Sequence, residues 1–266
     1  MIRQIDAVSH HNRLRPLPPA LLCGFGALLG LGAYLSHPAV RLLILIWAAV
    51  WTIGYAGVPA RLYMLMTGAA CLFFAAGLPA IIVEIGSAAA EEKAEHFRLF
   101  HIYGRSIYLT SSGIQTAWEA FTRMLACLAS SYMVILTVPV PELLAALKKL
   151  RVPSVVLDLI MIMYRFIFIL WLEAADMKTA QQARGGHNGL KGRLNDTAML
   201  AVHLFTSSMR RYHMLHQGLT ARGYDGHIPL PSLRMGAIPG RYKLEIIGGV
   251  AVLLLLEITI RLEVWP

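Results

Sequence analysis

The sequence predicts an all-α integral membrane protein of about five transmembrane helices, with a helical cytoplasmic domain inserted before the last span. Two observations carry this prediction. The chain is 57% hydrophobic and only 15% charged, whereas a soluble domain carries about a quarter charged residues. More than half of its 24 Lys and Arg residues fall in one segment between apolar runs, residues 141–243.

Four stretches with little or no charge come early in the chain. Each is near the length that crosses a hydrocarbon core of roughly 30 Å. They are residues 20–35, 42–58, 62–83 and 124–140. The fourth is expected to begin near Ala117, which would place Glu119 and Arg123 one turn apart, able to form an ion pair near the interface. Residues 246–260 form the fifth candidate.

The charge pattern orients these spans. Segment 84–115 between the third and fourth spans is nearly balanced and is interpreted as a loop, whereas residues 141–243 are strongly basic. Because cytoplasmic loops carry the excess of Lys and Arg, this basic segment is expected inside, with the N-terminus also inside. The predicted organisation is therefore residues 1–140 as N-terminal segment and four spans, 141–243 as cytoplasmic helices, and 244–266 as the last span.

The basic segment is expected to be helical, because Pro141 and Pro153 suit first-turn positions and good helix formers follow them. Residues 159–172 are ambiguous, being strongly apolar but interrupted by Arg165 and short for a span. We interpret them as a helix that is buried or lies at the interface. The alternative, a sixth and seventh span, stays open.

Two identical tripeptides end helices in this segment. Ala183-Arg184-Gly185 ends a helix from about Pro153, and Ala221-Arg222-Gly223 ends one from about Asn195. In each, Gly suits the left-handed residue that stops a helix, and Arg suits the negative end of the helix dipole. Ordinary capping explains one such end. Its repetition indicates a pair of docking points, because guanidinium groups bind acidic partners bidentately.

Several motifs in this segment resemble the T components of energy-coupling factor transporters, in particular the CbiQ proteins of the cobalt branch. They are Pro141-Glu142-Leu143-Leu144, Lys148-Lys149-Leu150-Arg151-Val152-Pro153, Tyr164-Arg165-Phe166-Ile167, Glu173-Ala174, Ala180-Gln181-Gln182-Ala183-Arg184-Gly185 and Gly218-Leu219-Thr220-Ala221-Arg222-Gly223-Tyr224-Asp225-Gly226. The resemblance is strongest over residues 141–226. Elsewhere it covers the number and order of the spans and, more weakly, Asp6 and residues 10–16.

The resemblance implies a non-catalytic subunit in the bacterial cytoplasmic (inner) membrane, the transmembrane part of an ATP-driven cobalt importer. Arg184 and Arg222, with the flanking Ala183, Gly185, Ala221 and Gly223, would end two coupling helices that dock on CbiO-like ATPases. ATP and Mg²⁺ would be bound by those ATPases. The membrane helices would contact lipid and a CbiM-like substrate-binding subunit, with a small CbiN-like subunit as a further candidate.

Other chemistry is poorly supported by the residues. Gly185 to Gly192 lacks the spacing of a phosphate-binding loop, so we interpret it as a flexible connection. The basic residues lack interleaved aromatics, so no nucleic acid is expected. No catalytic or metal site and no bound cofactor are expected, because the candidate ligands make incomplete sets. These ligands are Cys23, Cys71, Cys127, His10, His11, His96, His101, His203, His213 and His216.

Two alternatives stay open. Nickel or a vitamin could replace cobalt as the substrate, because neither composition nor spacing distinguishes them. A self-sufficient secondary transporter is the other, although it should show inward-facing charges and internal repeats that we do not find clearly.

Overall fold

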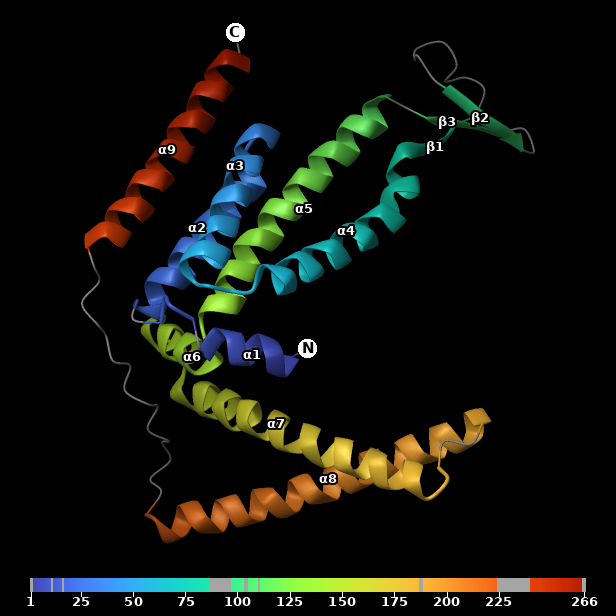
Figure 1. Ribbon diagram of the computed structural model, residues 1–266, viewed down its shortest axis with the longest axis vertical. Coiled ribbons are helices and arrows are strands. Elements are labelled where there is room, and N and C mark those ends of the chain that lie inside the picture. Colours follow the sequence, from blue (N-terminus) through green and yellow to red (C-terminus); the bar gives the residue numbers. More distant parts are fainter. Residues whose placement is uncertain are drawn as a thin grey trace. The chain divides into compact units, whose positions relative to one another are not determined.

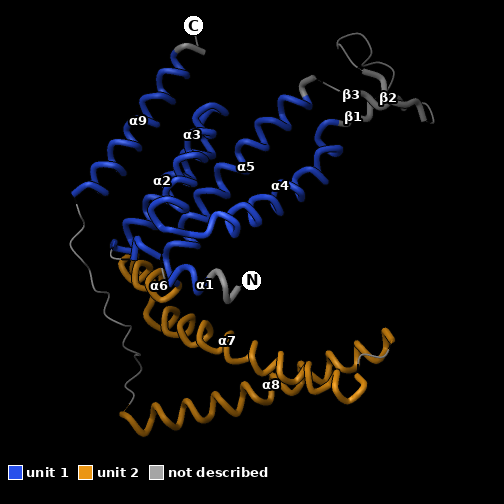
Figure 2. Tube along the Cα trace, in the orientation of Figure 1, with its two compact units in different colours: residues 1–139, 234–266 blue, residues 140–233 orange. Residues whose placement is uncertain are grey.

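The computed structural model describes residues 2–10, 12–15, 17–86, 97–102, 105–109, 111–186, 189–223 and 240–264. The chain divides into two compact units, which Figure 2 colours differently. The first comprises residues 1–139 and 234–266, and the second comprises residues 140–233.

The first unit begins with the short helix α1 (Ile2–His10), which is followed by α2 (Pro19–Leu35) and α3 (Pro38–Ala49). Proline is tolerated at the start of α2 and α3 because the first N–H groups of a helix have no partner within it. From α3 the chain continues into the π-helix η1 (Val50–Tyr55), so the helical segment reaches Tyr55.

The helix α5 (Ser111–Thr137) forms the centre of the first unit, because α2 and α3 both pack along it (Figure 1). The core around it includes Phe25, Trp51 and Met133, which are at most 2% exposed. The approach of α2 to α5 needs Gly26, where a Cβ would overlap the Val134 side chain. In a bilayer such close van der Waals packing, rather than transfer from water, holds helices together.

The helix α4 (Ala60–Ile82) contacts α5 but leaves most of its own surface uncovered in this chain. Leu72 and Phe73 are 75% and 82% exposed, and no atom lies within 4 Å of a Cβ placed on Gly68 or Gly77. The small residues of this helix therefore do not serve packing within the described chain at these two positions.

A small antiparallel sheet follows α4 in the segment that the sequence led us to interpret as a loop. Its strands are β1 (Val83–Gly86), β2 (Phe97–Ile102) and β3 (Arg105–Leu109), in the order β1-β3-β2. Val83 pairs with Leu109, and Phe97 also pairs with Leu109 on the other side. The expected loop is thus partly wrong, although the fold remains dominated by helices.

The last helix of the first unit, α9 (Gly240–Val264), contacts α3. A Cβ at Gly249 would overlap the Trp47 ring, so the two helices approach closely at this point. Ion pairs lie near both ends of α9, with Arg241 to Glu245 at 2.8 Å and Arg261 to Glu257 at 2.9 Å.

The second unit contains α6 (Val140–Lys149), α7 (Ser154–Ala183) and α8 (Gly189–Ala221). Pro153 is the N-cap of α7 rather than a first-turn residue. The helix expected from about Asn195 begins earlier, at Gly189, so the connection between α7 and α8 is shorter than predicted. His187 and Asn188 of this connection lie outside the described residues.

The described helices confirm a multi-pass membrane protein. By length and composition, residues 38–55, 60–82, 113–137 and 154–183 could each cross a membrane, and α2 is a shorter apolar helix. α7 is thus long enough to cross, which corrects the premise that residues 159–172 are too short. Residues 159–172 belong to this helix, which has 30 residues. The expected span at residues 246–260 lies within α9, whose flanking charges set it apart from these four.

The ion pair expected between Glu119 and Arg123 is not found among the described residues. The Arg123 guanidinium instead lies 5.3 Å from the centre of the Tyr34 ring, a cation–π arrangement. The Glu119 backbone carbonyl accepts a hydrogen bond of 3.2 Å from Nη1 of Arg41.

Candidate functional site

The helix α7 ends in a Schellman motif built on Ala183-Arg184-Gly185. Gly185 has φ +77° and donates its N–H to the Gln182 carbonyl at 3.1 Å. The next N–H, that of Gly186, reaches the Gln181 carbonyl at 2.9 Å. These two bonds satisfy carbonyls that the end of a helix would otherwise leave without partners.

The helix α8 ends with the same local geometry at Ala221-Arg222-Gly223. Gly223 has φ +73° and donates to the Thr220 carbonyl at 3.1 Å. The prediction that both glycines adopt the left-handed conformation is therefore confirmed. The rest of the second motif, Tyr224-Asp225-Gly226, lies outside the described residues.

The two arginines at these ends are exposed. Within the part of the chain that the structure describes, neither Arg184 nor Arg222 forms a salt bridge or a side-chain hydrogen bond. Each lies where the helix dipole is negative, so the positive charge is favoured there by roughly 0.3–1 kcal/mol. The two helix ends thus expose similar guanidinium groups.

Contacts between α7 and α8 hold the helices that carry these ends. Glu173 of α7 accepts hydrogen bonds from the Ser207 hydroxyl and from Nη2 of Arg211, the latter at 2.9 Å. The His203 ring lies 3.9 Å from the same carboxylate. The hydrogen bond from Ser207 and the charge and hydrogen bond of Arg211 lower the Glu173 pKa below its ordinary value, despite its partial burial.

A second contact lies where the chain turns between the helices. Nε2 of Gln181 donates to the Asp196 carbonyl at 3.0 Å. A Cβ on Gly186 would lie 2.7 Å from the Gln181 carbonyl oxygen and 2.9 Å from Oδ2 of Asp196. Only glycine fits this turn without movement of the backbone.

The antiparallel arrangement of α7 and α8 puts the two arginines at opposite ends of the pair (Figure 1). Arg184 lies near the turn, whereas Arg222 follows the 33 residues of α8. A helix of that length spans about 50 Å, at 1.5 Å per residue. The two arginines therefore lie at two separate points rather than in one cleft.

Much apolar surface of these helices is uncovered within the second unit. α8 has no buried residue among those described. Large apolar side chains that are more than half exposed on α7 and α8 include Val155, Trp171, Leu190, Leu194, Val202 and Phe205. Such a surface is typical of helices that pack on a partner or a membrane interface.

The described part of the fold does not bring candidate metal ligands together. In the described ranges, no three side chains among His, Cys, Asp and Glu come together in a way that could hold a metal ion. The absence of a metal site stays a prediction. Sequence reasoning missed the contacts of Glu173, although Ser207 and Arg211 are four residues apart and therefore share a helix face.

Comparison with known proteins identifies relatives along most of the chain. The CbiQ family profile, described as "Cobalt transport protein", matches residues 15–232. The chain is 29% identical over 243 residues to the cobalt transport protein CbiQ of Rhodobacter capsulatus, covering 90% of this chain and 91% of that protein.

Two further relatives are similar over shorter or more divergent regions. The energy-coupling factor transporter transmembrane protein EcfT of Limosilactobacillus fermentum is 26% identical over 234 residues, covering 83% of this chain and 81% of that protein. The "Putative fused cobalt transport protein CbiMQ" of Methanocorpusculum labreanum is 32% identical over 158 residues, covering 59% of this chain and 26% of that protein.

Proposed function

The chain belongs to the CbiQ family of cobalt transport proteins, and on this basis we propose that it is the transmembrane coupling subunit of an ATP-driven energy-coupling factor importer. Cobalt ions are the proposed substrate of the whole transporter. The chain itself would be non-catalytic, with ATP and Mg²⁺ bound by separate cytoplasmic ATPase subunits.

The observation that carries this proposal is the pair of matching helix ends. Arg184 and Arg222 are both exposed, both follow the last helical residue, and both precede a glycine with positive φ. An Arg guanidinium at a well-defined helix end suits an acidic groove on a partner, because its N–H donors form charge-assisted hydrogen bonds with carboxylates. Two such ends fit two ATPase domains, one at each end of the α7–α8 pair.

The contacts between α7 and α8 support transmission of movement between these ends. Because Glu173 binds both Ser207 and Arg211, a displacement of one helix would shift the other through a short, partly buried contact. Gln181 adds a second link at the turn. Coupling of this kind needs elements that move as connected bodies rather than independently.

The charges of α8 support a cytoplasmic position for the second unit. Lys191, Arg193 and Arg210 are exposed along a helix that packs on the C-terminal half of α7. Although α7 is long enough to cross a membrane, its C-terminal half packs against α8, which is basic and faces water. We propose that the apolar N-terminal part of α7 lies at the inner face of the cytoplasmic membrane, with the N-terminus of the chain on the same side.

The uncovered face of α4 supports a contact with a membrane partner. Gly68 and Gly77 leave open space on a helix whose most apolar window has no buried residue. Small residues let a second helix approach closely in lipid. We propose a CbiM-like substrate-binding subunit there, since one relative is named as a CbiM and CbiQ fusion, with a CbiN-like subunit as a further partner.

The test is co-purification of the ATPases from the native membrane. Tagged wild-type protein is compared with the Arg184→Ala, Arg222→Ala double variant, and the ATPase recovered is quantified. The matched control is Arg193→Ala, Arg210→Ala, which removes an equal number of positive charges, two, from exposed positions within α8. Loss of two desolvated charge-assisted contacts should reduce ATPase binding on the order of a hundredfold or more.

The outcomes separate the proposal from its alternatives. Loss of ATPase from the helix-end variant alone, with uptake of labelled cobalt lost in parallel, supports the coupling role. Equal loss from both variants would indicate a general charge effect. Uptake by the purified chain alone in liposomes would instead support a secondary transporter.

A further inference from the structure

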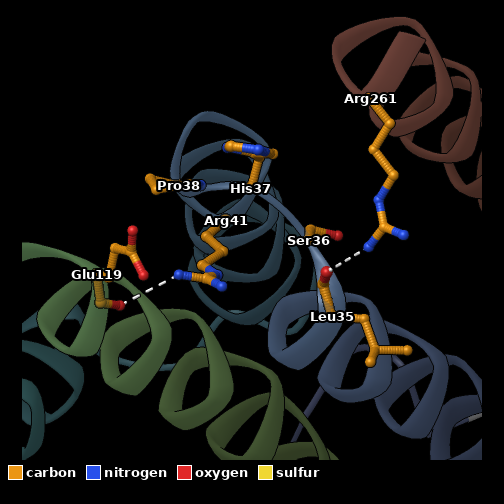
Figure 3. A pocket seen from close by; sticks show the side chains of 7 residues that line it. All are labelled: Leu35, Ser36, His37, Pro38, Arg41, Glu119 and Arg261. Atoms are coloured by element: carbon orange, nitrogen blue, oxygen red, sulfur yellow. Dashed lines mark hydrogen bonds between the residues drawn. The ribbon is translucent and has the colours of Figure 1, made fainter. Parts of the chain in front are cut away.

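A cavity of about 440 Å³ lies in the first unit where α2 ends and α3 begins (Figure 3). Its lining combines apolar surface from Leu35 and Pro38 with the polar side chains of Arg41, Glu119 and Arg261. Because α2, α3, α5 and α9 all contribute residues, the cavity belongs to the helix bundle itself. It is separate from the proposed coupling ends, which lie in the second unit.

Arg41 is the unusual member of this lining. Arg41 is only 5% exposed. Its guanidinium nevertheless forms one hydrogen bond with the described residues, from Nη1 to the Glu119 backbone carbonyl at 3.2 Å. Nε of Arg41 is buried without a partner. A guanidinium has five N–H donors, and leaving a buried charge without an anion is unfavourable. The Arg41 guanidinium therefore has donors that an oxyanion in the cavity could satisfy.

The other charges of the cavity do not supply that anion. The Arg261 guanidinium binds Glu257 at 2.9 Å and the Leu35 carbonyl at 3.0 Å, so its charge is already balanced. Glu119 lines the cavity from α5 beside Arg41 (Figure 3), but the two side chains form no ion pair among the described residues. One cation and one anion thus remain available in the same cavity.

An apolar cleft adjoins this polar cavity. It shares Ser36 and continues between α2, α3 and α9 along Leu28, Ile44, Val250 and Leu254. Its free volume is about 50 Å³, the share of one or two water molecules, so only the first part of a chain would lie within it; Glu257 also lines it. A polar cavity that opens onto an apolar cleft at the end of membrane helices has the two parts of a lipid site.

We propose that this cavity binds the headgroup of a zwitterionic phospholipid, phosphatidylethanolamine, with its phosphate on Arg41, its ammonium on Glu119 and an acyl chain along the adjoining cleft. The phosphate supplies charge-assisted acceptors for the unpaired guanidinium donors. The ammonium supplies donors that a glycerol headgroup lacks in charged form and that a choline headgroup lacks altogether. The proposal rests on the membrane position of the helices and is independent of the coupling role.

Native mass spectrometry of the full chain tests this assignment. The purified protein is reconstituted in nanodiscs with equal parts of phosphatidylethanolamine, phosphatidylglycerol and phosphatidylcholine, and the lipids retained after release are identified. Wild type should retain phosphatidylethanolamine in preference to the other two. Arg41→Gln should reduce retention of all three, whereas Glu119→Gln should retain lipid but lose the preference by roughly tenfold, the effect of one charge-assisted hydrogen bond.

Two controls keep the result decisive. Arg241→Gln removes an ion-paired Arg far from the cavity, near the start of α9, and should leave retention unchanged. Should Arg41→Gln fail to fold, the exposed Glu119 still gives a readout through headgroup preference. Equal retention of the three lipids by wild type, or displacement of the lipid by inorganic phosphate at millimolar concentration, would overturn the proposal.

Discussion

Glu173 and Arg211 join α7 to α8 through a bond of 2.9 Å between a carboxylate oxygen and Nη2. The same carboxylate accepts the Ser207 hydroxyl, so a single side chain of α7 is bound at two points one turn apart on α8. This contact lies between the two helix ends, Arg184 and Arg222. It is therefore placed to decide whether the ends move together.

A double-mutant cycle on Glu173→Ala and Arg211→Ala should give a coupling free energy of about 1 kcal/mol or less. The Arg211 side chain is 37% exposed, so solvent screening weakens the pair. Chemical denaturation in detergent measures it. The matched cycle on Arg241 and Glu245, where the Arg side chain is 76% exposed, should give the smaller value. A larger value there would contradict this account.

The stability of the α7–α8 contact should depend on pH only in acid. The Glu173 pKa is lowered in the folded protein, chiefly by Ser207, so its contribution is present above the ordinary value of 4.5 and is lost as pH falls through the lowered pKa. Hydrogen exchange of α7 and α8 should therefore show steady protection above pH 4.5 and a loss of protection as the pH falls below that value. Glu173→Gln should remove this acid transition.

Alanine should be unfavourable at each helix end. Gly185→Ala or Gly223→Ala places a Cβ in the left-handed region, at a cost of roughly 1–2 kcal/mol, although no neighbouring atom obstructs it. Thermal unfolding should show a lower midpoint for each variant. The control Gly218→Ala, inside α8 with open space around it, should raise stability by up to about 1 kcal/mol. The same sign at all three positions would contradict the assigned geometry.

The contact of α9 with α3 should be sensitive to one methyl group. Gly249→Ala forces a Cβ into the Trp47 ring and should cost about 1–3 kcal/mol of unfolding free energy. Gly248→Ala, which has open space, is the matched control. A smaller side chain, in Trp47→Leu combined with Gly249→Ala, should recover part of the loss. Denaturation in detergent measures all three variants.

The sequence predicted features that depend on local chemistry. Uncharged runs of sufficient length indicated the membrane helices, because backbone groups in lipid must be satisfied within a helix. Glycine after Ala-Arg indicated both helix ends, because left-handed backbone there favours glycine. The docking role of these ends stays a prediction.

Features that depend on distant residues were not predictable. The charges of Glu119 and Arg123 suggested an ion pair by spacing, but Tyr34 on α2 provides the partner for Arg123. The unpaired state of Arg41 likewise follows from the packing of α3 against α5, which no periodicity encodes. The helix predicted from about Pro153 to Ala183 is confirmed as α7, whereas its length and apolar composition allow a span that residues 159–172 alone did not indicate.

The length of α8 has a consequence for how the chain tolerates insertions. Each added residue would turn Arg222 by about 100° about the helix axis and move it about 1.5 Å from the turn at Gly186. One inserted residue would thus direct the guanidinium to another side, whereas seven would nearly restore its direction and lengthen the helix by about 10 Å. Rotational phase, more than length, would then limit which insertions two partner domains with fixed grooves accept.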